Sequence, residues 1–175
     1  MTVTSILQAW VPFYSVIASA AAALTGLMFV VLTLVATLDR AASRDGIAIY
    51  STPTVVHYAV VLFLSAVLCA PWRTFAGPAI VLAVAGLGGM LYETVLAVAA
   101  RKLSAYDPDA EDWVWYSVLP LAGYGMIVVA AALLFTGREL ALYTSAAGAI
   151  LLVVVGIHNA WDIVTYLALP RNGEK

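Results

Sequence analysis

The sequence predicts an all-α integral membrane protein: a five-transmembrane-helix bundle that forms a single transmembrane domain over residues 1–175. Composition is the first observation, since 64% of the residues are hydrophobic and only 10% are charged. Soluble domains are about 45–50% apolar and about 25% charged. A soluble chain of 175 residues has too little interior to bury so much apolar surface, so lipid is the expected solvent.

The second observation is that the apolar residues form long runs, each near the roughly 20 residues that a transmembrane helix needs. Pro12 precedes the first run, and Pro53 suits the first turn of the second, where its missing N–H costs nothing. Pro120 lies inside the fourth run and is expected to kink it, while Pro170 ends the fifth. The five predicted helices cover about residues 13–38, 53–70, 78–100, 114–136 and 140–169.

The third observation is the distribution of positive charge, which indicates the orientation. Lysine and arginine are enriched on the cytoplasmic side of membrane proteins, whereas acidic residues contribute little to this rule. Of the two sides that five spans define, one has only Arg73 and Arg138. The other is therefore expected to be cytoplasmic, with the N-terminus outside and the C-terminus in the cytoplasm; it carries Arg40, Arg44, Arg101, Lys102, Arg171 and Lys175.

Small residues recur at helical spacing along three of the predicted spans. They permit close backbone approach, which is how helices associate in lipid. Such surfaces suit packing within one chain or association between copies. Because five short helices leave little room for a wide pore, we expect any pore to need a homo-oligomer. The small residues are Ala18, Ala22 and Gly26, then Gly86, Gly88 and Gly89, then Gly148 and Gly156.

Four ionisable residues lie within the predicted spans: His57, Glu93, His158 and Asp162. Each costs about 2.5–3.5 kcal/mol on insertion scales, so a functional site is the default hypothesis. At 1.5 Å per residue all four fall in the cytoplasmic half, where they are expected to approach one another. Other polar residues at this depth complete the candidate polar cluster: Asn159, Tyr124, Thr33 and Thr37.

This cluster has several possible interpretations. It is a structural hydrogen-bond network, in which Asp162 orients His158 and Glu93 meets His57, or a proton or ion pathway, because facing titratable groups are what a relay needs. Alternatively, His57, Glu93 and His158 bind a divalent metal, or His57 and His158 are the axial ligands of a haem. The chain has no nucleophile-elbow motif, so we predict no catalytic residues and do not expect an enzyme. A net charge of −2 without a basic run argues against nucleic-acid binding.

We therefore expect a homo-oligomeric proton or ion channel, or a transport-type protein, that uses the polar cluster. The alternative is a haem- or metal-binding membrane protein, or a non-catalytic accessory or regulatory membrane subunit. Three segments, at residues 21–26, 52–57 and 156–162, resemble those of an uncharacterised family of small bacterial polytopic membrane proteins. The resemblance implies a multi-pass protein of the bacterial inner membrane and brings no activity, cofactor or partner with it.

Overall fold

The computed structural model describes residues 2–37, 52–101 and 110–168, with side chains described for all of these except 34–37 and 166–168. Most of the described residues are helical, and they contain no strand. The elements are α1 (Val3–Thr37), α3 (Thr52–Cys69), α4 (Ala76–Ala100), α5 (Ala110–Trp113), the π-helix η2 (Val114–Val118), α6 (Leu119–Phe135) and α7 (Leu140–Ala168). Since α5, η2 and α6 run on as one helix, five helices are long and apolar enough to cross a membrane.

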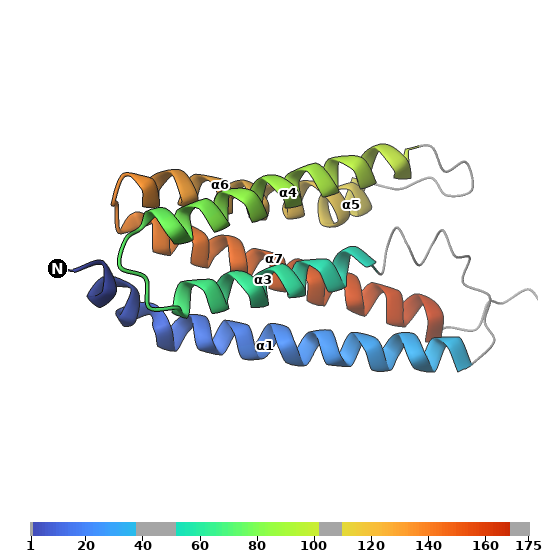
Figure 1. The fold of residues 1–175 in the computed structure, drawn as a ribbon. Helices are drawn as coiled ribbons and strands as arrows, with labels where there is room; N and C mark the ends of the chain where they lie inside the picture. Colours follow the sequence, from blue (N-terminus) through green and yellow to red (C-terminus); the bar gives the residue numbers. More distant parts are fainter. Residues whose placement is uncertain (1, 38–51, 102–109, 169–175) are drawn as a thin grey trace, which may run out of the picture.

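The predicted helix boundaries agree with the observed ones to within a few residues, except at the start of α1. That helix begins at Val3 rather than at residue 13, and Pro12 lies inside it. The side-chain oxygen of Thr2 explains the earlier start, because it accepts a hydrogen bond from the backbone N–H of Ser5 at 3.2 Å, as an N-cap does. The first turns lie at an angle to the rest of α1 (Figure 1). Leu38 and Leu169, predicted as helix ends, lie outside the described residues.

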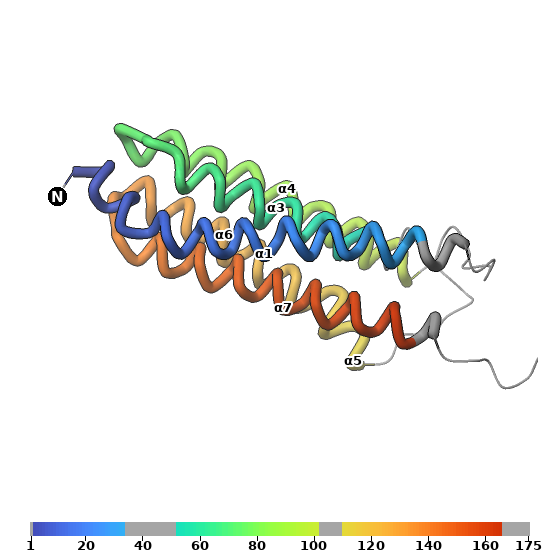
Figure 2. Tube along the Cα trace, turned by 90° about the horizontal axis from the view of Figure 1, so that it is seen from below, coloured from blue at the N-terminus to red at the C-terminus, as the bar shows by residue number. Residues whose placement is uncertain are grey.

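Four helices form a square in cross-section, and the fifth packs on one side of it. In Figures 1 and 2, α4 and α6 lie side by side in one layer, α3 and α7 in the next, and α1 beyond them. The helix contacts agree: α6 packs on α4 and α7, and α1 packs on α3 and α7. The interior of the α3–α4–α6–α7 square is therefore where buried side chains of four helices meet.

We call the two ends of the bundle the N-terminal end, where α1 begins, and the C-terminal end, where α7 finishes; Figure 1 shows them at opposite ends. The chain turns at the N-terminal end between α3 and α4 and between α6 and α7. Gly137 makes the second turn with a φ of 67°, a left-handed conformation that glycine adopts without strain.

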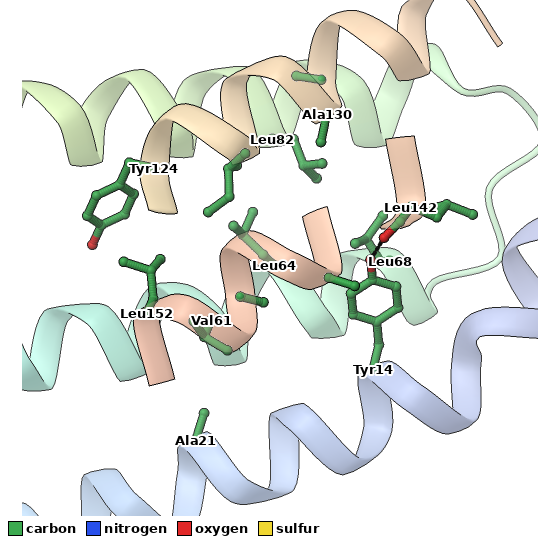
Figure 3. Close-up of a cluster of buried hydrophobic side chains, with 14 of the residues drawn as sticks. Tyr14, Ala21, Val61, Leu64, Leu68, Leu82, Tyr124, Ala130, Leu142 and Leu152 are labelled. Atoms are coloured by element: carbon green, nitrogen blue, oxygen red, sulfur yellow. Dashed lines mark hydrogen bonds between the residues drawn. The ribbon is translucent and has the colours of Figure 1, made fainter. Parts of the chain in front are cut away.

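The core of the square is apolar in its central part. Val61 and Leu64 of α3 face Leu82 of α4 and Leu152 of α7, and all four are nearly inaccessible (Figure 3). The outward faces are also apolar, with Val16, Val84 and Leu91 more than 60% exposed. A helix that is hydrophobic on all sides belongs in the core of a large protein or in lipid. The exposed apolar faces therefore support the multi-pass membrane assignment.

The fourth span has an irregular turn immediately before Pro120, the residue that predicts a kink. Its backbone takes one turn of π-helix, Val114–Val118, in which the N–H of Leu119 bonds to the carbonyl of Val114. Pro120 follows directly after this turn, as the second residue of α6. The wider turn thus accommodates the proline, and π-turns of this kind are frequent at functional sites.

Candidate functional site

Two of the four predicted ionisable residues meet inside the square. His57 of α3 and Glu93 of α4 are 0% and 1% exposed, and the distance between His57 Nε2 and Glu93 Oε1 is 3.8 Å. The other ring nitrogen of His57, Nδ1, is 3.0 Å from the hydroxyl of Tyr124 on α6. Side chains from three helices thus form one buried group, which we call the His57–Glu93–Tyr124 cluster.

The position of Tyr124 depends on a glycine of the neighbouring helix. A Cβ on Gly89 would lie 2.2 Å from two atoms of the Tyr124 ring, so only glycine leaves space for the ring there. Glu93 follows Gly89 by four residues and lies on the same face of α4. The face of α4 that contacts the Tyr124 ring at Gly89 therefore also carries the carboxyl group of Glu93. Figure 3 shows the Tyr124 hydroxyl pointing away from the apolar core.

The cluster suits proton transfer between neutral and charged forms. When the Tyr124 hydroxyl donates to Nδ1, the Nε2 of a neutral His57 carries its proton on the side that faces Glu93. Protonated His57 would instead donate from both ring nitrogens. Either the imidazole or the carboxyl group can therefore hold the shared proton.

His158 and Asp162 form a second group at the C-terminal end, on α7. The His158 ring stacks on Trp115 of η2, with ring centroids 3.7 Å apart and an interplanar angle of 4°. Asp162 is exposed, and the Tyr116 hydroxyl donates to its Oδ2 at 3.4 Å. The π-turn therefore supplies aromatic partners to both residues. Sequence reasoning missed the stacking of Trp115 on His158, since pairing across helices cannot be read from spacing within one helix.

The remaining predicted residues divide between interior and surface. Asn159 is 1% exposed and lies inside the bundle, and its Oδ1 is 3.4 Å from Nδ1 of His158. Thr33 is exposed, and its hydroxyl bonds to the carbonyl of Phe29 at 2.8 Å, one turn earlier on α1. Thr33 thus lies on the outer face of α1 and away from the cluster. The side chain of Thr37 lies outside the described residues.

Sequence reasoning also missed two buried residues of α3, Thr54 and Tyr58, which are both 0% exposed. Thr54 lies three residues before His57 on the same helix face and four residues before Tyr58, so the spacing of Thr54 to these two residues was the available signal. A third omission is Tyr14 of α1, whose hydroxyl donates to the carbonyl of Leu142 at 2.9 Å and also contacts Ser145 (Figure 3).

Metal binding was predicted to use His57, Glu93 and His158. Among the described residues, no three His, Cys, Asp or Glu side chains come together in a way that fits a metal ion. His158 has Asn159 and Trp115 as its partners, whereas His57 has Tyr124 and Glu93. The haem alternative, with His57 and His158 as axial ligands, stays a prediction from the sequence.

Comparison with known proteins gives no family assignment: no protein-family model matches the chain, and no curated protein or solved structure is similar to it. The functional argument therefore rests on the geometry of the site.

Proposed function

We propose that the protein conducts protons or ions across the membrane and that the His57–Glu93–Tyr124 cluster is its titrating centre. One observation carries the proposal: an imidazole and a carboxyl group lie 3.8 Å apart with both side chains almost wholly buried in the bundle. Ionisable groups within a membrane are costly, and in transport proteins they mark proton relays. Two facing groups of this kind can exchange a proton.

The apolar centre of the bundle supplies the barrier that such a protein needs. Val61, Leu64, Leu82 and Leu152 fill the core on the N-terminal side of the cluster (Figure 3). Hydrophobic constrictions of this kind gate by wetting and dewetting. In the proposed mechanism, a proton reaches the cluster from the C-terminal end and crosses the apolar layer only when water enters it.

The positive charge predicted near the C-terminal end makes that end cytoplasmic in this proposal, in a bacterial inner membrane. Homo-oligomer formation is also part of the proposal. A face of α1 that carries Ser19, Ala22 and Gly26 is exposed, and nothing lies within 4 Å of a Cβ placed on Gly26. Small residues support close helix–helix packing in lipid, so a second copy would find this face suited to contact.

Flux measurements with purified protein in liposomes test the proposal. A pH gradient and, in separate vesicles, a K⁺ gradient are imposed, and internal pH or K⁺ is followed with a trapped dye. We expect the pH gradient to collapse faster than in empty vesicles and the K⁺ gradient to persist, because the buried cluster offers exchangeable protons. Collapse of neither gradient, with folded protein confirmed in the vesicles, would refute conduction.

A further inference from the structure

Five polar side-chain atoms inside the C-terminal half of the square have no hydrogen-bond partner among the described residues. All belong to side chains that are at most 1% exposed. A buried polar atom without a partner is unfavourable, and native proteins pair nearly all such atoms with protein groups or ordered water. The atoms are Thr54 Oγ1, His57 Nε2, Tyr58 OH, Glu93 Oε1 and Asn159 Nδ2.

The helix geometry brings these atoms into one region. Thr54 lies one turn before both His57 and Tyr58 on α3, so its side chain is a neighbour of each, although His57 and Tyr58 themselves point in different directions. The Tyr58 ring packs on α7 at Gly156, where a Cβ would lie 2.4 Å from its Cε1. Asn159 is almost one turn beyond Gly156 towards the C-terminal end. Because α3 and α7 run in opposite directions, Thr54 and Asn159 fall at about the same level.

The contact between His57 and Glu93 also leaves polar atoms without hydrogen-bond partners. The distance of 3.8 Å is longer than a hydrogen bond, and neither His57 Nε2 nor Glu93 Oε1 has another partner in the described part of the chain. A polar contact longer than about 3.5 Å is often bridged by water. One water molecule that donates to Glu93 and pairs with Nε2 of His57 would complete the hydrogen bonding of both groups.

We propose that these five polar groups bind a file of internal water molecules, which runs from Thr54 and Asn159 near the C-terminal end to the His57–Glu93 pair. Buried waters make about three hydrogen bonds each to otherwise unpaired polar groups, and this region supplies donors and acceptors from three helices. The file stops at the apolar layer of Val61 and Leu64. Its role as the proton access path rests on the proposed function, but the water site itself does not.

The buried hydroxyl of Ser65 lies beyond the end of the proposed water file. It also has no hydrogen-bond partner among the described residues, but it lies about two turns beyond Tyr58 on α3. Val61, Leu64 and Leu68, all buried and apolar, surround it on the same helix. A water molecule needs two to four polar partners, so Ser65 is not part of the file.

The Tyr58→Phe substitution tests the water file, because the file predicts whether the thermal midpoint of the variant falls or rises relative to the wild type. If the hydroxyl is dry, its removal relieves an unpaired buried group, and the thermal midpoint in detergent stays the same or rises. If water binds it, the midpoint falls. Tyr14→Phe is the matched control, because the Tyr14 hydroxyl has protein partners and its loss must lower the midpoint. We expect both variants to fall; an unchanged or higher midpoint for Tyr58→Phe alone would overturn the proposal.

Radiolytic labelling of the wild-type protein in H₂¹⁸O gives a second readout that does not depend on flux. Hydroxyl radicals made from bound water label the side chains beside that water. We expect ¹⁸O on Tyr58 and much less on Tyr14, which is equally buried but paired with protein. Equal, low labelling of both tyrosines would overturn the water file. Strong Tyr58 labelling in a protein that conducts no protons would uphold the file and refute the proposed conduction.

Discussion

The ring of Tyr124 lies directly against the backbone of Gly89, and its hydroxyl reaches Nδ1 of His57 at 3.0 Å. This contact fixes the spacing between α4 and α6 at the level of the cluster. It also ties the histidine of α3 to both helices, although α3 and α4 themselves pack less closely than the other neighbouring pairs. The glycine, the tyrosine and the histidine therefore act as one unit.

The two adjacent glycines of α4 give a direct test of this contact. Gly89→Ala places a methyl group on the Tyr124 ring and should lower the free energy of unfolding by about 1–3 kcal/mol, as overpacking does. Gly88→Ala is the matched control, since nothing lies within 4 Å of its Cβ position and alanine favours helix. Thermal unfolding in detergent measures both. A Gly89→Ala variant as stable as Gly88→Ala would contradict the close packing of Tyr124 on α4.

The hydroxyl of Tyr124 should contribute separately from its ring. Tyr124→Phe keeps the packing on Gly89 but removes the hydrogen bond to His57, so we expect a loss of about 0.5–1.5 kcal/mol in unfolding free energy. The pH dependence of proton flux should also shift, because the imidazole loses a partner. Flux curves that superimpose on the wild type across pH 5–8, with unchanged stability, would show that this hydrogen bond does not form.

The two histidines should behave differently, because only one lies in the cluster. His57→Gln removes the group beside Glu93 and should reduce proton flux at least tenfold. His158→Gln removes a ring that stacks on Trp115 and should leave most of the flux. Both variants are compared in liposomes at equal amounts of folded protein. Loss of flux in His158→Gln with full flux in His57→Gln would move the titrating centre to the second group.

The number of membrane-length helices and most of their boundaries follow from the sequence, because apolar runs of about 20 residues have few alternatives to crossing a membrane. The start of α1 could not be predicted in this way. Pro12 favoured a helix start after it, whereas the N-cap at Thr2 and packing against the bundle keep the earlier turns helical. The π-turn before Pro120 could not be predicted from the sequence either. A proline leaves one helical hydrogen bond unmade, and a kink or a wider turn can each accommodate this.

The contact of Glu93 with His57 was predictable from the sequence, whereas the aromatic partners of His158 and Asp162 were not. The free-energy cost of an ionisable side chain within a membrane span identifies His57 and Glu93 as candidates from the sequence. The packing of α3 and α4 then brings the two side chains together. His158 has the same residue type at similar depth, yet it stacks on Trp115, which lies in the π-turn. The sequence also does not show which small residues lie in helix contacts. Gly89 lies in such a contact and its neighbour Gly88 does not.

Orientation in the membrane is a separate prediction. A reporter fused after Lys175 should be active only in its cytoplasmic form, and one placed near Met1 only in its external form, because the positive charges favour that arrangement. Reporter activity in cells measures this directly. The finding of both termini on one side would contradict five membrane crossings.

Proton flux through Glu93→Gln is the most direct measurement of the central claim, that the buried carboxyl group carries protons. Glutamine keeps the size and hydrogen bonding of Glu93 but cannot exchange a proton, and Glu139→Gln, in the exposed turn between α6 and α7, is the control with the same chemical change. With a pH gradient across liposomes, the account predicts wild-type flux in Glu139→Gln and a loss of at least tenfold in folded Glu93→Gln. Flux that stays at the wild-type level in Glu93→Gln would contradict it.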